Sequence, residues 1–128
     1  MALKQLSSSE QLVVLQCMEA IADSDAIGDW EFQTRLGIAR PVLRKIISSW
    51  PEIDDGSKNS DGFLAVNNCL NEVCHGVNWA ESEWQNWFTE PKDVVKRTYK
   101  NWLRLAGSLS GGIAVMLPIV RLLQITGN

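Results

Sequence analysis

The sequence predicts an all-α protein, a compact bundle of about six or seven short helices. Apolar residues recur at intervals of three and four through most of the chain, as in the stripe of Leu12, Leu15, Met18 and Ala22. Cap residues, glycines and prolines divide these periodic stretches into segments of helical length. A chain of 128 residues with 45% hydrophobic content can bury one core without metal or disulfide support. Residues 1–128 are therefore expected to form a single domain.

The first two helices are predicted from their caps and their apolar spacing. A helix over residues 9–23 follows Ser8 and Gln11, which have the spacing of a capping box. A second helix is expected over residues 29–36, because Gly37 suits the left-handed position that ends many helices. These helices begin the N-terminal half of the predicted bundle.

A third helix and a linker complete that half. Pro41 suits the first turn of a helix that ends near residue 50. Residues 51–61 are rich in Gly, Asp, Ser and Asn and lack apolar periodicity, which is typical of a linker between residues 9–50 and the C-terminal half, residues 62–128.

The C-terminal half is predicted to contain further helices. Residues 62–74 carry a helical apolar stripe with asparagines toward the other side, and Asn78 with Glu81 could cap the next helix. In the helix after Pro91, an inward stripe lies opposite a row of cations at steps of four. The inward residues are Val95, Tyr99, Trp102 and Ala106, and the outer cations are Lys92, Lys96, Lys100 and Arg104.

The apolar tail leaves three roles open. No charged residue occurs between Leu105 and Val120, and residues 113–125 are expected to form a short helix after a Gly-rich loop. This segment could belong to the core or form a homodimer interface. Membrane contact is the third and least expected role, because a spanning helix needs about twenty apolar residues without such breaks.

The stretch EFQTRLGIARPVLRKII resembles a helix-turn-helix over residues 29–50. Gly37 falls on the turn glycine of that family, Ile38 on its apolar turn residue, and Leu43 and Ile46 on the anchors of its recognition helix. The resemblance implies DNA contacts by Arg40, Arg44 and Lys45. The alternative is a helical packing corner whose arginines are solvated.

A wider pattern covers most of residues 10–90. DWEFQTRLG, FLAVNNCLNEV and the following HG resemble a group of small bacterial proteins of no assigned function. This resemblance implies a self-contained bacterial domain and carries over no catalytic residue.

Charge is divided into segments along the chain. Residues 51–90 have eight acidic and one basic residue, a net charge of −7, whereas residues 91–128 have six basic and one acidic, a net charge of +5. The acidic segment also holds three tryptophans within nine positions, which can fill a core or anchor a protein interface. The predicted protein-binding residues are Asp54, Asp55, Trp79, Glu81, Glu83, Trp84 and Trp87.

Catalysis, metals and cofactors are not expected. The only histidine is His75, and its spacing from Cys69 and Cys74 does not match a structural zinc site. Three cysteines cannot all pair internally, which favours free thiols in a reducing cytoplasm, and no secretory signal begins the chain.

Two functions follow as hypotheses. The first is a non-catalytic cytoplasmic module, an adaptor or an immunity-type small acidic protein, which binds a basic protein through the Trp-rich face. The alternative is a helix-turn-helix DNA-binding regulator that uses Arg40, Arg44, Lys45, Lys92, Lys96 and Lys100. The lysine row has a plainer explanation as a solvated helix face.

Overall fold

A computed structural model describes residues 1–109, and within this range it contains seven α-helices and no strand. The predicted all-α fold is confirmed. No helix in this part of the chain combines the length and the apolarity needed to cross a lipid bilayer. The expected tail helix at 113–125 lies outside the described residues.

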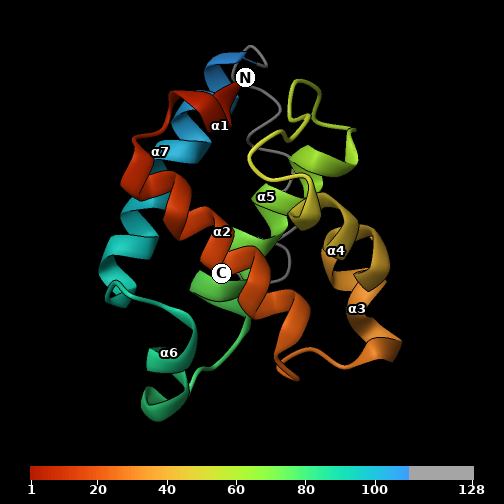
Figure 1. Ribbon diagram of the computed structural model, residues 1–128, viewed down its shortest axis with the longest axis vertical. Coiled ribbons are helices and arrows are strands. Elements are labelled where there is room, and N and C mark those ends of the chain that lie inside the picture. The colour runs from red at the N-terminus through yellow and green to blue at the C-terminus, as the bar shows by residue number, and fades with distance from the viewer. Residues whose placement is uncertain (110–128) are drawn as a thin grey trace.

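Two helices form the centre of the bundle, α2 (Ser8–Asp23) and α5 (Asp61–Asn71). They pack against each other, and both also contact α4 (Arg40–Ser48) and α7 (Lys92–Leu109). Figure 1 shows α7 on one side of this central pair, with α4 and α3 (Asp29–Leu36) on the other. The two helices that carry the predicted basic residues, α4 and α7, are thus separated by the central pair.

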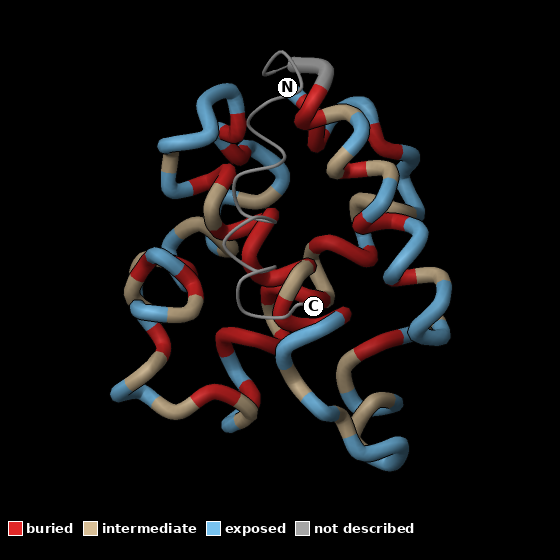
Figure 2. The backbone as a smooth tube through the Cα atoms, turned by 180° about the vertical axis from the view of Figure 1, so that it is seen from behind, coloured by how far each residue is buried: buried red, intermediate tan, exposed pale blue. Residues whose placement is uncertain are grey.

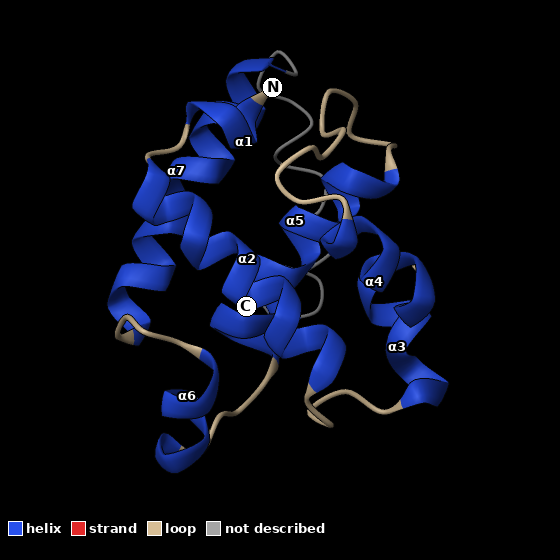
Figure 3. Ribbon diagram, in the orientation of Figure 1, coloured by secondary structure: helices blue, strands red, loops and turns tan. Residues whose placement is uncertain are grey.

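The remaining elements cover the ends of the central pair. The short α1 (Ala2–Gln5) packs against α7, and α6 (Glu81–Trp87) packs against α2. A π-helical turn, Glu72–Gly76, continues α5 directly, and Figure 3 shows the long loop that leads from α4 into α5. Four residues are too few to display a helical period, so the sequence did not predict α1.

One hydrophobic cluster runs through the bundle, and Figure 2 shows its buried positions along the inner sides of the helices. Every α-helix except α6 contributes a fully buried side chain to it. The inward stripe predicted for α7 is confirmed, since Val95, Tyr99, Trp102 and Ala106 are all buried. These four buried side chains hold α7 against the central helices.

The predicted stripe of α2 is confirmed at Met18 and Ala22, which are buried, but Leu12 is 49% exposed. Val13, Val14 and Ile21 are also buried, so the buried face is wider than predicted and does not include Leu12. The start of α2 also shifts by one residue, because Ser7 forms the capping box. Its hydroxyl accepts from the N–H of Glu10, and the Glu10 carboxylate accepts from the N–H of Ser7.

Asn67 and Asn68 of α5 are internal, which corrects their expected place on the outer side. Trp102 donates its indole N–H to Asn67 over 3.1 Å, and Asn67 donates to Asn68 over 3.1 Å. Asn68 then donates to the backbone carbonyl of Leu36 over 2.8 Å. This polar network joins α7, α5 and the end of α3, where Gly37 has the predicted left-handed backbone with φ 76°.

Candidate functional site

The residues around α6 form a cluster of aromatic rings. The ring centroids of Trp84 and Phe88 lie 4.0 Å apart at an interplanar angle of 30°. Trp79 meets both rings edge-on, with centroids at 6.3 Å from Trp84 and 5.5 Å from Phe88. Phe88 is buried, whereas the two tryptophans are only partly buried. The cluster therefore presents ring surface to solvent as well as to the core.

Hydrogen bonds to the backbone fix both indoles. Trp79 donates its ring N–H to the carbonyl of Val73 over 3.2 Å, and Trp84 donates to the carbonyl of Glu90 over 2.8 Å. Since each indole has one polar group, a ligand can contact only the carbon surfaces of these rings. The rings are positioned before any ligand arrives, which reduces the entropy lost on binding.

A pocket of about 490 Å³ opens beside this cluster, between α6 and the start of α7. Its walls combine aromatic rings with acidic groups and one lysine. The lining residues include Trp79, Glu81, Trp84, Phe88, Glu90 and Lys92. The volume falls in the range of small-molecule sites.

The segment between α6 and α7 is tied to α2 through a pair of side chains. Gln16 donates its amide to the hydroxyl of Thr89 over 3.0 Å, and its carbonyl oxygen accepts from the backbone N–H of Thr89 over 3.3 Å. Thr89 lies between Phe88 and Glu90 in the sequence, so this contact holds Glu90 near the aromatic rings. The geometry of the pocket therefore depends on α2.

The acidic groups at the site are available to a partner. The carboxylates of Glu81, Glu83 and Glu90 form no ion pair or hydrogen bond with any residue of the described range. Glu81 is exposed, and the other two are partly exposed. Unpaired carboxylates near a partly apolar surface create a negative potential that attracts cations.

The structure brings together only part of the predicted acidic surface. Glu83 and Trp87 lie on α6 but do not line the pocket. Asp54 and Asp55 belong to the loop after α4, far from α6 in Figure 1. Asp55 is 2% exposed and accepts from the backbone N–H of Leu3 over 2.8 Å, which corrects its expected place on an exposed binding surface.

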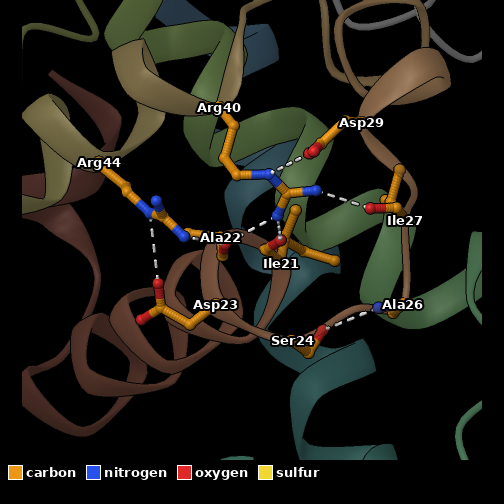
Figure 4. Close-up of polar contacts among 9 residues, drawn as sticks. All are labelled: Ile21, Ala22, Asp23, Ser24, Ala26, Ile27, Asp29, Arg40 and Arg44. Atoms are coloured by element: carbon orange, nitrogen blue, oxygen red, sulfur yellow. Dashed lines mark hydrogen bonds and ion pairs between the residues drawn. The ribbon is translucent and has the colours of Figure 1, made fainter.

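The cations of the helix-turn-helix-like segment differ in their exposure and in their hydrogen-bond partners. Arg40 donates to the carbonyls of Ile21, Ala22 and Ile27 and to the carboxylate of Asp29, as Figure 4 shows. Its guanidinium carbon also lies 4.3 Å from the centre of the Phe32 ring. This side chain points into the protein, which corrects its predicted place on a DNA-facing surface.

The neighbouring cations are more exposed. Arg44 donates to the carbonyl of Ala22 over 3.1 Å and pairs with Asp23 at 3.5 Å, while Lys45 is exposed and has no such partner in the described range. The predicted lysine row on α7 is exposed at Lys92, Lys96 and Lys100. Because α4 and α7 lie on opposite sides of the central helices, these cations do not form one surface.

Sequence reasoning missed one exposed tryptophan. Trp30, at the start of α3, is 87% exposed, the most exposed large hydrophobic side chain among residues 1–109. Its acidic neighbours Asp29 and Glu31 were the available signal, since charges on both sides indicate a solvent-facing turn. Phe88 and Pro91 were also missed as pocket residues, because their contribution depends on how the chain returns toward α7.

The three cysteines, Cys17, Cys69 and Cys74, are buried and their thiols are free. No three side chains of the metal-binding type lie close enough together in the described residues to hold an ion. Burial lowers the pKa of His75, and the nearby Lys96 and Lys92 lower it further, so its imidazole favours the neutral form.

The chain matches no family model, no curated protein and no solved structure in sequence or fold comparisons.

Proposed function

We propose that this chain is a non-catalytic module, of the adaptor or immunity type, that binds a basic protein at the pocket beside α6. The observation that carries the proposal is the meeting of two fixed indoles with unpaired carboxylates at one opening. Aromatic side chains in such positions supply much of the binding energy in protein interfaces. Acidic groups around them speed the approach of a basic partner.

The free, buried thiols support a reducing compartment, and we include a cytoplasmic location in the proposal. The DNA-binding alternative has less support. Arg40 is engaged by backbone carbonyls, and the remaining cations belong to α4 and α7, two helices on opposite sides of the central pair. Lys45 is the cation that best represents the α4 surface, because it is exposed and unpaired within the described range.

Site-specific photo-crosslinking tests the proposal. A photoreactive phenylalanine derivative replaces Gln85, an exposed residue that lines the pocket, or Gln33, an exposed residue on α3. In cells of the source organism, the derivative at position 85 should form an adduct with one defined basic protein, and the derivative at position 33 should not. The adduct should disappear when Glu81→Lys is added and persist with Lys45→Glu, which reverses a charge on the far side.

Adducts at both positions alike, or loss of the adduct with Lys45→Glu alone, would contradict the proposal. The second outcome would favour the α4 surface and the helix-turn-helix alternative.

A further inference from the structure

The pocket beside α6 restricts the chemistry of the group that it can hold. Both indole N–H groups already donate to backbone carbonyls, so they cannot donate to a ligand. A carbonyl-rich segment, such as a proline-rich peptide, is usually oriented by hydrogen bonds from donors such as indole N–H groups. The two indoles of this pocket cannot supply those hydrogen bonds. An anionic group would face Glu81 and Glu90. The ring faces and the carboxylates together suit a cation.

From this geometry we infer that the pocket takes one arginine side chain of the partner, with the guanidinium against the face of Trp84 or Trp79 and paired to Glu81 or Glu90. This inference rests on the proposed protein-binding function and names the group recognised. A planar guanidinium can stack on an aromatic ring and pair with a carboxylate at the same time. An ammonium can make the charge contact but does not match the flat ring surface as well.

Lys92 provides an internal check on the inference. Lys92 lines the same pocket, and its ammonium forms no ion pair with the described residues. Two carboxylates against one ammonium leave the lining negative, but Lys92 still opposes an incoming cation. Replacing Lys92 with Gln should therefore strengthen the binding of an arginine, whereas Glu81→Gln and Glu90→Gln should weaken it.

The probe is the tripeptide acetyl-Gly-Arg-Gly-amide, titrated into the full chain labelled with nitrogen-15. Each of the six tryptophans gives one indole N–H signal, and Trp→Phe variants assign them. The matched peptides contain citrulline, which has the shape of arginine without its charge, or lysine. Trp30 serves as an internal reference, because it is the most exposed indole of the described residues and lies on α3.

The signals of Trp79 and Trp84 should shift with the arginine peptide, while the signal of Trp30 stays in place. Binding of one side chain should be weak, in the millimolar range, because a single cation–ring contact and an exposed ion pair are each worth about tenfold or less. We expect the citrulline peptide to bind several-fold more weakly, and Lys92→Gln to tighten the arginine peptide by about twofold to fivefold.

Equal shifts with citrulline and arginine would overturn the inference and leave the pocket as a site for neutral segments. A stronger response to lysine than to arginine would also overturn it. Either result, combined with the crosslink at position 85, would leave the proposed function standing. If that crosslink is lost and only the Trp30 signal shifts with the arginine peptide, both the inference and the proposed function are contradicted.

Discussion

The guanidinium of Arg40 donates to the backbone carbonyl of Ala22 over 2.8 Å, at the C-terminal end of α2. The same group also donates to Ile21 and Ile27. Carbonyls in the last turn of a helix have no partner within that helix, and a cation there also favours the helix dipole. Arg40 therefore joins the beginning of α4 to the end of α2, a structural role that competes with contact to DNA.

Replacing Arg40 with Ala should lower the free energy of unfolding by about 3 kcal/mol, because several charged hydrogen bonds are lost and buried carbonyls lose their partner. Arg40→Lys should recover only part, since an ammonium cannot reach carbonyls on separate segments as the guanidinium does. Urea unfolding followed by far-ultraviolet circular dichroism measures both. Lys45→Ala is the control, with an expected change within about 0.5 kcal/mol. An Arg40→Ala variant as stable as the wild type would disprove this role.

The internal asparagine network gives a second prediction. Asn68→Ala removes the donor to the Leu36 carbonyl and the acceptor for Asn67, and it should lower the free energy of unfolding by about 2 kcal/mol. Asn78→Ala is a matched control, because Asn78 is exposed and has no hydrogen bond within the described range. Thermal or urea unfolding of the pair measures the difference. Equal stabilities of the two variants would show that the network contributes little.

The buried thiols should be unreactive in the folded protein. Burial raises the pKa of Cys74 to about 12, and burial also raises the pKa of Cys17 and Cys69 well above the usual range. The thiolate is the reacting form, so Ellman's reagent at mildly alkaline pH should react slowly with the native chain. Addition of denaturant should release all three thiols rapidly. Rapid reaction of one thiol without denaturant would place that cysteine at the surface.

Asp55 should make folding stability depend on pH. Burial raises its pKa in the folded state, although the N–H of Leu3 favours the charged form. A raised pKa means that the folded chain holds this proton more tightly, so the stabilisation from Asp55 is lost as pH rises through the folded pKa. Asp55→Asn resembles the protonated form and cannot titrate.

The difference in free energy of unfolding between wild type and Asp55→Asn should therefore be small in acid and should favour the variant as pH rises toward neutrality. Urea unfolding of both chains from about pH 3.5 upward measures this difference and cancels the titration of the other carboxylates. A variant that becomes less stable than wild type at neutral pH would mean that the charged carboxylate is the favoured buried form.

Local sequence signals predicted several elements closely. The bounds of α3 agree with the prediction of 29–36, because Gly37 adopts a backbone conformation with φ 76° that other residues rarely adopt. The inward face of α7 was also predicted, since a long amphipathic helix repeats its pattern over several turns. By contrast, Ser7 and Ser8 both have capping spacing, and sequence alone favoured the second.

The candidate site was predicted only where it is local. Trp79, Glu81 and Trp84 are near one another in sequence, so their meeting at one pocket follows from a short helix. Asp55 and Arg40 were misplaced because their partners are distant, Leu3 at 52 residues and Ala22 at 18 residues along the chain. Such contacts depend on how helices pack, which periodicity does not specify.

The most direct test of the central claim is the equilibrium Kd between the purified chain and the basic protein captured at position 85, measured for two matched variants. Trp84→Leu removes a ring from the pocket, and Trp30→Leu makes the same change on α3, with circular dichroism to confirm that both fold. The account predicts that Trp84→Leu raises Kd by about tenfold or more while Trp30→Leu leaves it within about twofold. A large loss with Trp30→Leu and none with Trp84→Leu would place the binding surface on α3 and contradict the account.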